Sequence, residues 1–287
     1  MSRTPLIVTC VIGVFQCGFQ AFRFRLKPRQ TALMRPIIIF FCSLLASLPL
    51  SAREVKITYL ANEGVMIECG SDKILIDALF RDSLDQYVRH PPQVQEELET
   101  GKPPFDGVTL ALATHFHLDH WDAGAITRFL SNNPHAVFAS TPQATAMLPS
   151  SQGQQIRTLW PEKSEPVRLQ VGNVVVDAFS LEHGDYSTTQ NLGYRISVCQ
   201  QVLFHLGDAG LSDQNFAALT QAGQADVAMV PWWLLDAKGG AFIKEKWKPH
   251  RIVVLHFGGA DGDAAKQVVS TWPQAWVCTK QGESRTF

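Results

Sequence analysis

Three histidines and one aspartate occur within six residues in the segment His115-Phe116-His117-Leu118-Asp119-His120. This segment directly follows an apolar run, Val108 to Ala113, which is typical of a buried strand. Neutral imidazoles and carboxylates at a strand end are what a transition-metal site requires, and histidine is the commonest such ligand. Because four side chains so close in sequence do not converge easily on one ion, the spacing favours two adjacent ions.

Three further residues of the same chemical types follow other apolar runs. His183, Asp208 and His256 each stand where an expected strand stops. Strand ends are rigid platforms on which loops can hold a metal ion. Any one of these residues alone could be an ordinary loop or core residue, but together with the first segment they predict a metal site.

The elements around these residues occur in a repeated order, in which short β-branched strands come first and strands alternating with helices follow. Strands are predicted at 55–60, 65–69, 73–76, 108–113, 136–139, 167–171, 174–180, 193–198, 202–206, 226–230 and 251–256, and helices at 94–99, 123–130, 142–147, 213–221 and 261–271. This order predicts an α+β fold, a four-layer αβ/βα sandwich of two mixed sheets with outer helices. Since no linker interrupts residues 53–287, we expect them to form one domain.

Residues 1–52 differ in character from the rest, with six basic and no acidic side chains. Met34-Arg35-Pro36, an uncharged run of 14 residues from Ile37 to Leu50, and Ser51-Ala52 match a signal peptide at 34–52 that is cleaved after Ala52. The run is shorter than the ~20 residues of a membrane-spanning helix. We therefore expect an exported protein, periplasmic or secreted, with membrane attachment only if the leader stays uncleaved. Met34 is an alternative start to Met1.

The net charge also differs between the leader and the rest of the chain. The 287 residues carry 25 basic and 26 acidic side chains and are 46% hydrophobic, which is ordinary for a globular protein. Without the leader, 19 basic residues face 26 acidic ones, a formal charge of about −7. An acidic protein repels polyanions, so we expect no nucleic-acid partner.

The cysteines outside the leader are Cys69, Cys199 and Cys278. They are far apart and lack CxxC spacing, so neither a disulfide framework nor a thiolate zinc site is indicated. At most one disulfide can form, and we expect instead that these residues are small buried hydrophobic side chains.

Taken together, the motifs resemble those of the metallo-β-lactamase-fold hydrolases. The matching parts are the 115–120 block, His183 in Leu-Glu-His-Gly, Asp208 in Leu-Gly-Asp-Ala-Gly and His256 in Val-Leu-His-Phe-Gly-Gly. The opening residues 57–77 are also similar to the family's early strands, which end in a short Asp turn. The resemblance runs from about residue 55 to 260 and implies the metallo-β-lactamase fold.

The resemblance also implies roles for the seven candidate ligands. It assigns His115, His117 and His183 to a first metal, Asp119, His120 and His256 to a second, and Asp208 to a bridge between them. The implied cofactors are two divalent ions, for which zinc fits the donor set and manganese or iron are alternatives. A metal-bridging hydroxide would attack the substrate.

Two aspartates have further roles in this interpretation. Asp119 is also the candidate catalytic residue, because it can orient the attacking hydroxide. Asp77 is a candidate to accept a ring N–H of a ligand histidine, although a turn residue after a strand would explain it equally well.

The resemblance favours a hydrolase of ester-like bonds. The Leu-Gly-Asp-Ala-Gly motif looks like the branch of sugar-phosphate lactonases and phospholipases D of the N-acyl-phosphatidylethanolamine type, so we expect a lactone or phosphodiester in a small-molecule or lipid-like substrate. Class B β-lactamases usually carry a Cys ligand and lack the bridging Asp, which makes that activity an alternative. An iron-dependent sulfur dioxygenase and a non-catalytic metal-binding protein are the others. The oligomeric state stays open.

Residues near the expected metal site are candidates for substrate contacts. Asp185 and Tyr186 lie two and three residues after His183. Trp232 and Trp233 follow a strand toward the same edge, where they would form an apolar wall of the cleft or pack in the core. The Pro-rich insert 81–106 precedes the histidine block and could cover the cleft. We expect His205 to be a packed strand residue, and prolines next to His90, His135 and His250 indicate loop positions.

Overall fold

The computed structural model describes residues 54–84, 86–161, 165–184 and 188–287. The predicted leader and the candidate substrate residues Asp185 and Tyr186 lie outside this part. All described residues belong to a compact unit that spans Leu50–Phe287. Among them, no helix is long and apolar enough to cross a membrane.

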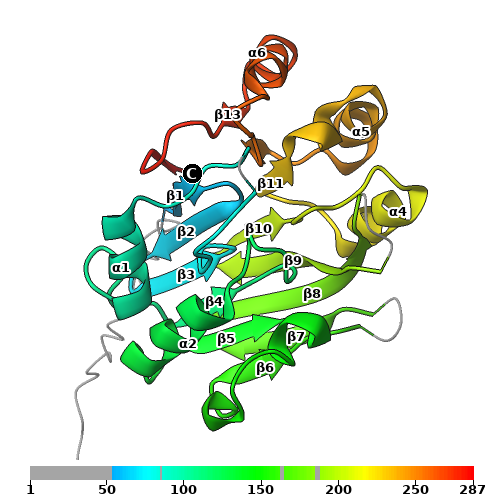
Figure 1. The fold of residues 1–287 in the computed structure, drawn as a ribbon. Coiled ribbons are helices and arrows are strands. Elements are labelled where there is room, and N and C mark those ends of the chain that lie inside the picture. The colour runs from blue at the N-terminus through cyan, green and yellow to red at the C-terminus, as the bar shows by residue number, and fades with distance from the viewer. Residues whose placement is uncertain (1–53, 85, 162–164, 185–187) are drawn as a thin grey trace, which may run out of the picture. The chain divides into compact units, whose positions relative to one another are not determined.

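Two mixed sheets of seven strands each form the centre of this unit (Figure 1). The first contains β1 (Lys56–Ala61), β2 (Gly64–Cys69), β3 (Asp72–Ile76), β4 (Leu110–Leu112), β5 (Val137–Ser140), β6 (Ile156–Thr158) and β14 (Ser284–Thr286). The second contains β7 (Val167–Val171), β8 (Val174–Glu182), β9 (Gln190–Val198), β10 (Gln201–His205), β11 (Val227–Pro231), β12 (Arg251–Leu255) and β13 (Trp276–Val277).

Each sheet joins an antiparallel part to a parallel part. In the first, the order is β14-β1-β2-β3-β4-β5-β6, with parallel pairing from β3 to β6. In the second, the order is β13-β12-β11-β10-β9-β8-β7, with parallel pairing from β10 to β13. This repeated plan confirms the predicted order of antiparallel strands followed by strand–helix units. Parallel strands point their carboxyl ends to one edge, which is where loops can assemble a site.

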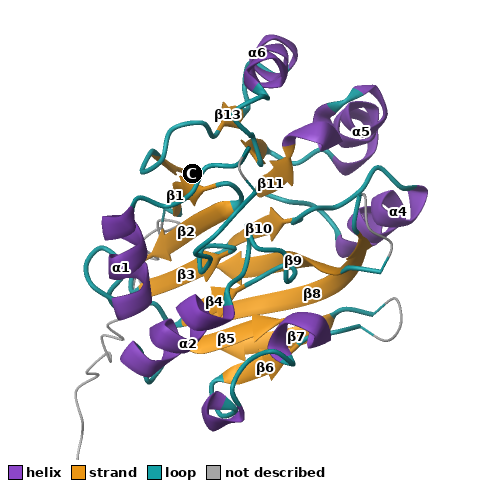
Figure 2. Ribbon diagram, viewed as in Figure 1, coloured by secondary structure: helices purple, strands orange, loops and turns teal. Residues whose placement is uncertain are grey.

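Helices lie outside the two sheets (Figure 2). They are α1 (Pro92–Thr100), α2 (Ala123–Asn132), α3 (Pro142–Thr145), α4 (Asp213–Ala222), α5 (Ala237–Phe242) and α6 (Gly262–Thr271), with short 3-10 helices at Ser150–Gln152 and Trp232–Leu235 and a π-helical turn at Ile243–Trp247. The edge strands β6, β13 and β14 were not among the predicted elements.

Three apolar clusters hold the layers together. One lies between the sheets and joins residues such as Ile67 of β2 and Ile196 of β9. A second joins the first sheet to its helices, where Met66 packs with Phe129, and a third joins the second sheet to α4, α5 and α6. Neighbours Met66 and Ile67 enter different clusters because successive strand side chains point to opposite faces. The predicted four-layer sandwich of two mixed sheets with outer helices is therefore confirmed.

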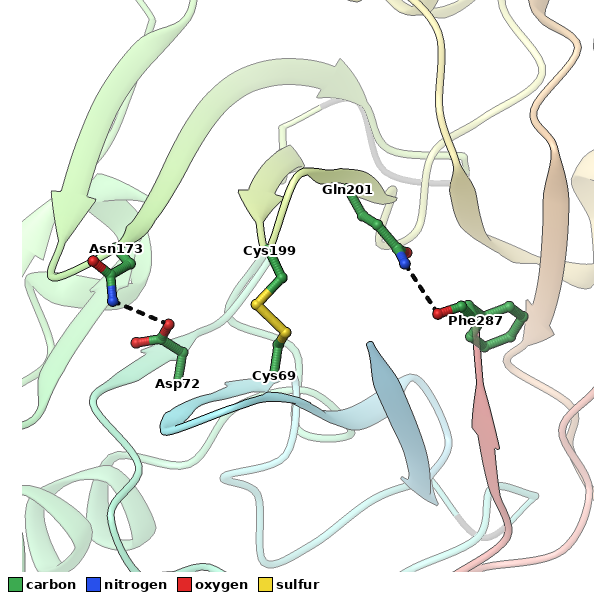
Figure 3. The surroundings of a disulfide bond; sticks show 6 residues. All are labelled: Cys69, Asp72, Asn173, Cys199, Gln201 and Phe287. Carbon is green, nitrogen blue, oxygen red and sulfur yellow. Dashed lines mark hydrogen bonds between the residues drawn. A yellow bond between two sulfur atoms is a disulfide. The ribbon is translucent and has the colours of Figure 1, made fainter. Parts of the chain in front are cut away.

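A disulfide joins the two sheets, which corrects the expectation that the three cysteines are reduced core residues. Cys69 ends β2 and Cys199 follows β9, and their Cα atoms are 6.4 Å apart (Figure 3). The partners are separated by 130 residues in sequence, so local patterns could not show that these two strand ends meet. Cys278 is a buried free thiol, as expected.

Candidate metal centre

All seven predicted ligands meet at one edge of the two sheets. The 115–120 block follows β4, His183 follows β8, Asp208 follows β10 and His256 follows β12. Their ligand atoms form two groups, one of His115, His117, His183 and Asp208 and one of Asp119, His120 and His256, and within each group the atoms lie within 4.8 Å of one another. The grouping matches the predicted division between two ions.

Asp208 stands between the two groups with one carboxylate oxygen toward each. Its Oδ2 lies 3.8 Å from Nε2 of His115 and 3.3 Å from Nε2 of His183. Its Oδ1 lies 3.4 Å from Nε2 of His120 and 3.2 Å from Nε2 of His256. A carboxylate with this orientation can donate one oxygen to each of two neighbouring cations, as predicted for the bridging residue.

Asp119 completes the second group. Its Oδ2 lies 3.5 Å from Nε2 of both His120 and His256. The side-chain amide of Asn62, from the turn between β1 and β2, donates a hydrogen bond of 2.9 Å to the same oxygen. The second group is thus held from both sheets, since Asn62 belongs to the first and His256 to the second.

Asp77 holds the histidine block in place through hydrogen bonds. Its Oδ1 accepts the backbone N–H of Thr114 at 2.7 Å, and its Oδ2 accepts the Thr114 hydroxyl at 2.7 Å. The same Oδ2 lies 3.0 Å from Nδ1 of His120, so His120 carries its proton on Nδ1 and turns Nε2 toward Asp208. A carboxylate that fixes the tautomer of a ligand histidine is a recurring feature of metal sites.

The backbone just before Asp208 packs closely against the start of the histidine block. Gly207 has φ of +53°, and a Cβ there would lie 2.6 Å from the Cβ of Thr114. Only glycine meets both requirements without strain. Gly207 therefore lets the loop that carries Asp208 pack directly against the start of the histidine block.

Buried ring nitrogens without hydrogen-bond partners show that the residues fit a metal. Among the described residues these include Nε2 of His115, His120 and His256. The Oδ1 atom of Asp208 is also buried without a hydrogen-bond partner. Leaving a buried polar atom unpaired costs roughly 1–3 kcal/mol. Unpaired atoms of this kind within two clusters of potential ligands are explained if they bind metal, and imidazole with carboxylate suits zinc, manganese or iron.

The charges of the groups favour cation binding. Burial lowers the pKa of His115 well below its usual value, and the charge of His120 acts in the same direction, so this ring is neutral and can bind a metal. Burial opposes ionisation of Asp208, but His256 and His120 hold its pKa well below the usual range. Burial also opposes a proton on His120, yet Asp119, Asp208 and Asp77 raise its pKa well above normal. A metal ion must displace that proton.

Glu63 is a buried carboxyl beside the centre that sequence reasoning missed. Neither of its oxygens has a hydrogen-bond partner among the described residues, and one lies within 4.8 Å of ligand atoms of His120 and Asp208. Burial and then the charge of Asp208 raise its pKa well above the usual value, so it is neutral. In the sequence it looked like a turn residue, and no local signal marks it.

His205 is a packed strand residue, as expected. Its Nε2 lies 3.1 Å from the carbonyl oxygen of Glu63, and its Nδ1 accepts the backbone N–H of Gly207 at 3.3 Å. Both ring nitrogens are thereby used. Burial lowers its pKa, which is consistent with a neutral ring that supports the loop before Asp208.

Aromatic residues surround His256. Trp233 lies edge-on to its ring, with an interplanar angle of 67° and centroids 4.9 Å apart, and donates its indole N–H to the carbonyl oxygen of Ala209 at 2.9 Å. Trp232 stacks on Phe257 instead, with centroids 6.3 Å apart. Tyr87, which sequence reasoning did not single out, lies edge-on to His256 at 4.5 Å.

Comparisons with known proteins agree with this geometry. The model of the β-lactamase superfamily domain matches residues 72–260. UPF0173 metal-dependent hydrolases of Pyrococcus horikoshii and Pyrococcus furiosus are each 27% identical to this chain and align with 80% of it and 98% of their own length.

Solved structures show the same fold. The metallo hydrolase Igni18 of Ignicoccus hospitalis has a TM-score of 0.57 and 20% identity over 82% of this chain and 98% of its own. An isothiocyanate hydrolase from Delia radicum gut bacteria has a TM-score of 0.59 and 16% identity over 81% and 99% of the two chains. Since the family match covers more than half of the sequence, the chain belongs to the β-lactamase superfamily.

Proposed function

We propose that this member of the β-lactamase superfamily is a hydrolase that uses two divalent metal ions, of which zinc fits best, to cleave a lactone or phosphodiester bond. The observation that carries the proposal is the orientation of Asp208, whose two oxygens face the two histidine groups separately. A cysteine ligand of the kind found in class B β-lactamases does not occur in either group of the described residues. The metal-dependent hydrolases among the relatives give further support.

Two bound ions would supply a water nucleophile at neutral pH and polarise the electrophile. The chain's own contribution begins with Asp119. Asn62 fixes its Oδ2 at 2.9 Å, which leaves Oδ1 to accept a hydrogen bond from the attacking water and orient it. Burial opposes ionisation of Asp119, but His120 and His256 lower its pKa, so the carboxylate stays charged and can hold the water in place.

The surroundings of the centre support a substrate with an apolar part. Leu118 lies within the histidine block and is 54% exposed, and Leu84 of the preceding insert is 50% exposed. Trp233 adds an aromatic surface beside His256. Exposed large apolar side chains around a polar centre are typical of sites for small organic or lipid-like molecules. The acidic charge argues against nucleic acid as the substrate.

We further propose that the protein acts outside the cytoplasm, in the periplasm or after secretion. The predicted signal peptide supports this, and so does the Cys69–Cys199 bond, because structural disulfides persist in oxidising compartments. Mass spectrometry of the exported protein should find Arg53 at its N-terminus. An intact Met1 or Met34 would contradict cleavage.

The test of function uses protein purified after expression of the full chain. Bound metals are measured by elemental analysis, and hydrolysis is assayed on phosphodiester, lactone, thioester and β-lactam substrates with wild type and Asp119→Asn. We expect bound transition metal and hydrolysis of one of the first two classes, with a loss of about 10²-fold or more in the variant. Iron as the only metal with no hydrolysis would favour a sulfur dioxygenase, and activity indifferent to the substitution would refute the mechanism.

A further inference from the structure

We propose that Tyr87 is a catalytic residue of this centre, which donates a hydrogen bond from its phenol to the substrate oxygen that gains negative charge beside His256. The proposal rests on the proposed hydrolase function and adds a contribution from the insert that precedes the histidine block. It involves no covalent step, since the phenol keeps its proton throughout.

The position of Tyr87 follows from its contact with a ligand of the second group. Its ring meets that of His256 at 89°, with centroids 4.5 Å apart. The phenol is also close enough to the site for the charges of Asp208 and Asp119 to act on it. Tyr87 is half-buried, so part of its side chain remains accessible to solvent.

A short backbone ladder fixes Tyr87 in this place. Tyr87 forms an antiparallel bridge with Gly258, and the N–H of Gly259 donates to the carbonyl oxygen of Gln86 at 2.6 Å. A Cβ on Gly258 would lie 2.9 Å from that same carbonyl oxygen and 3.4 Å from Cδ1 of Tyr87. The glycine after Phe257 thus permits an approach that a larger residue would prevent.

The segment that carries Tyr87 is tied down beyond it as well. Nε2 of His90 lies 3.0 Å from the carbonyl oxygen of Ala78, and the His90 ring packs on Phe80 with centroids 4.5 Å apart. The side-chain amide of Gln281 donates to the carbonyl oxygen of Arg89 at 2.9 Å. We call residues 86–90 the strap. Because it is anchored at both ends, it can hold a phenol in place before the substrate arrives.

The hydroxyl proton of Tyr87 is available for donation. The side chain of Gln86 hydrogen-bonds the phenol. A phenol has an ordinary pKa of about 10 and therefore keeps its proton at physiological pH, so Tyr87 can act as a hydrogen-bond donor.

A fixed donor beside the centre has a definite chemical use. Hydrolysis of a carbonyl or phosphoryl group builds negative charge on an oxygen in the transition state, and a preorganised donor stabilises it without reorganisation. Tyr87 belongs to the first half of the chain and His256 to the second, so the fold brings together two residues that are far apart in the sequence. A donor on the strap would act on whichever substrate oxygen lies over the second ligand group.

The test compares Tyr87→Phe, which keeps the ring contact with His256, with Asp213→Asn, a change at an exposed position at the start of α4. Metal content should be equal in wild type and both variants. In Tyr87→Phe we expect kcat to fall about 10²-fold with KM changed less than about threefold. Calorimetry of the metal-loaded protein with inorganic phosphate as an oxyanion probe should show about tenfold weaker binding. Asp213→Asn should match wild type in all three measurements.

A second variant probes the position of the strap. Gly258→Ala should displace Gln86 and Tyr87 and weaken phosphate binding to the level of Tyr87→Phe, and the combined substitution should add little. Phosphate binding by Tyr87→Phe equal to wild type, with kcat within twofold, would overturn the proposal. A wild type that binds phosphate but hydrolyses none of the substrates would instead contradict the proposed function, and the phosphate data alone would then decide whether the phenol reaches the oxyanion.

Discussion

The two ends of the stacked sheets are built in contrasting ways. At the edge where β4, β8, β10 and β12 end, seven candidate metal ligands lie together, six of them buried, and several of their ligand atoms have no hydrogen-bond partner in the described structure. At the opposite ends of β2 and β9, the Cys69–Cys199 bond joins the sheets covalently, beside the hydrogen bonds Asn173–Asp72 and Gln201–Phe287 (Figure 3).

The backbone shows the same contrast. Asp77 and His256 have φ of 47° and 67°, values that cost strain in residues other than glycine and that cluster at functional sites. Cys199 and Gln200 also have positive φ, of 49° and 65°, but they form the two-residue turn between β9 and β10, where such values suit the twist of a hairpin. The metal end therefore stores strain and unpaired groups, whereas the disulfide end stabilises the frame that holds them.

The largest expected effect comes from the bridging residue of the metal end. Asp208→Asn removes the negative charge shared by both ligand groups, so we expect loss of bound metal and a fall in kcat/KM of about 10³-fold or more. Elemental analysis and substrate kinetics measure the two losses. The exposed Asp213→Asn is the matched control and should stay within twofold of wild type, while an Asp208 variant with full metal and activity would contradict the assignment.

Removing the disulfide should lower stability and leave the metal site unchanged. Replacing Cys69 and Cys199 by Ser should lower the free energy of unfolding by about 2–5 kcal/mol, since the bond closes a long loop. Metal content and kcat should be unchanged in the folded protein. Urea unfolding with and without a reductant measures the effect, because reductant should destabilise wild type alone. Loss of metal in the double variant would show that the two ends are not independent.

His90, in the strap, should make the free energy of unfolding depend on pH. Burial lowers the pKa of His90 from 6.5 to about 4. Because the folded-state pKa is below the unfolded one, His90 contributes stability above pH 6.5 that is lost as pH falls from 6.5 to about 4, about 3 kcal/mol in all. Unfolding free energies of wild type and His90→Gln, measured across this range, should converge toward pH 4. Parallel curves would contradict a buried neutral His90.

The smallest effect is expected from the residue that supports the ligands. Asp77→Asn weakens the hold on Nδ1 of His120 and should lower metal affinity about 10–100-fold, with the fold retained. Competition with a chelator measures the affinity. Asp72→Asn, a change at the start of β3 near the disulfide, should leave the metal affinity unaltered, and equal affinities in the two variants would argue against the support by Asp77.

Sequence reasoning found the parts of the site that follow strands. The seven ligands stand at strand ends, so the alternation of apolar runs and polar residues located them, and the family resemblance sorted them into two groups. Asp77 was also predicted, because an Asp turn after β3 is part of the same pattern. The central strands and the longer helices were predicted within a few residues for the same reason.

Features that depend on distant segments could not be predicted. Glu63 looked like a turn residue until the structure buried it beside Asp208, and Tyr87 lies in a segment without regular periodicity. Cys69 and Cys199 meet because two hairpins from different sheets end at the same level, and β14 pairs with β1 from the other end of the chain. None of these contacts leaves a local signal, since each is decided by the packing of the two sheets.

The central claim is that Asp208 joins two metal ions in one site, and metal stoichiometry tests it most directly. Elemental analysis of the purified full chain, combined with X-ray absorption spectroscopy of the bound metal, should give two ions per chain about 3.5–4 Å apart. The same measurement on Asp208→Asn should show the pair disrupted. One ion per chain in wild type, or two ions without a short metal–metal distance, would contradict the account.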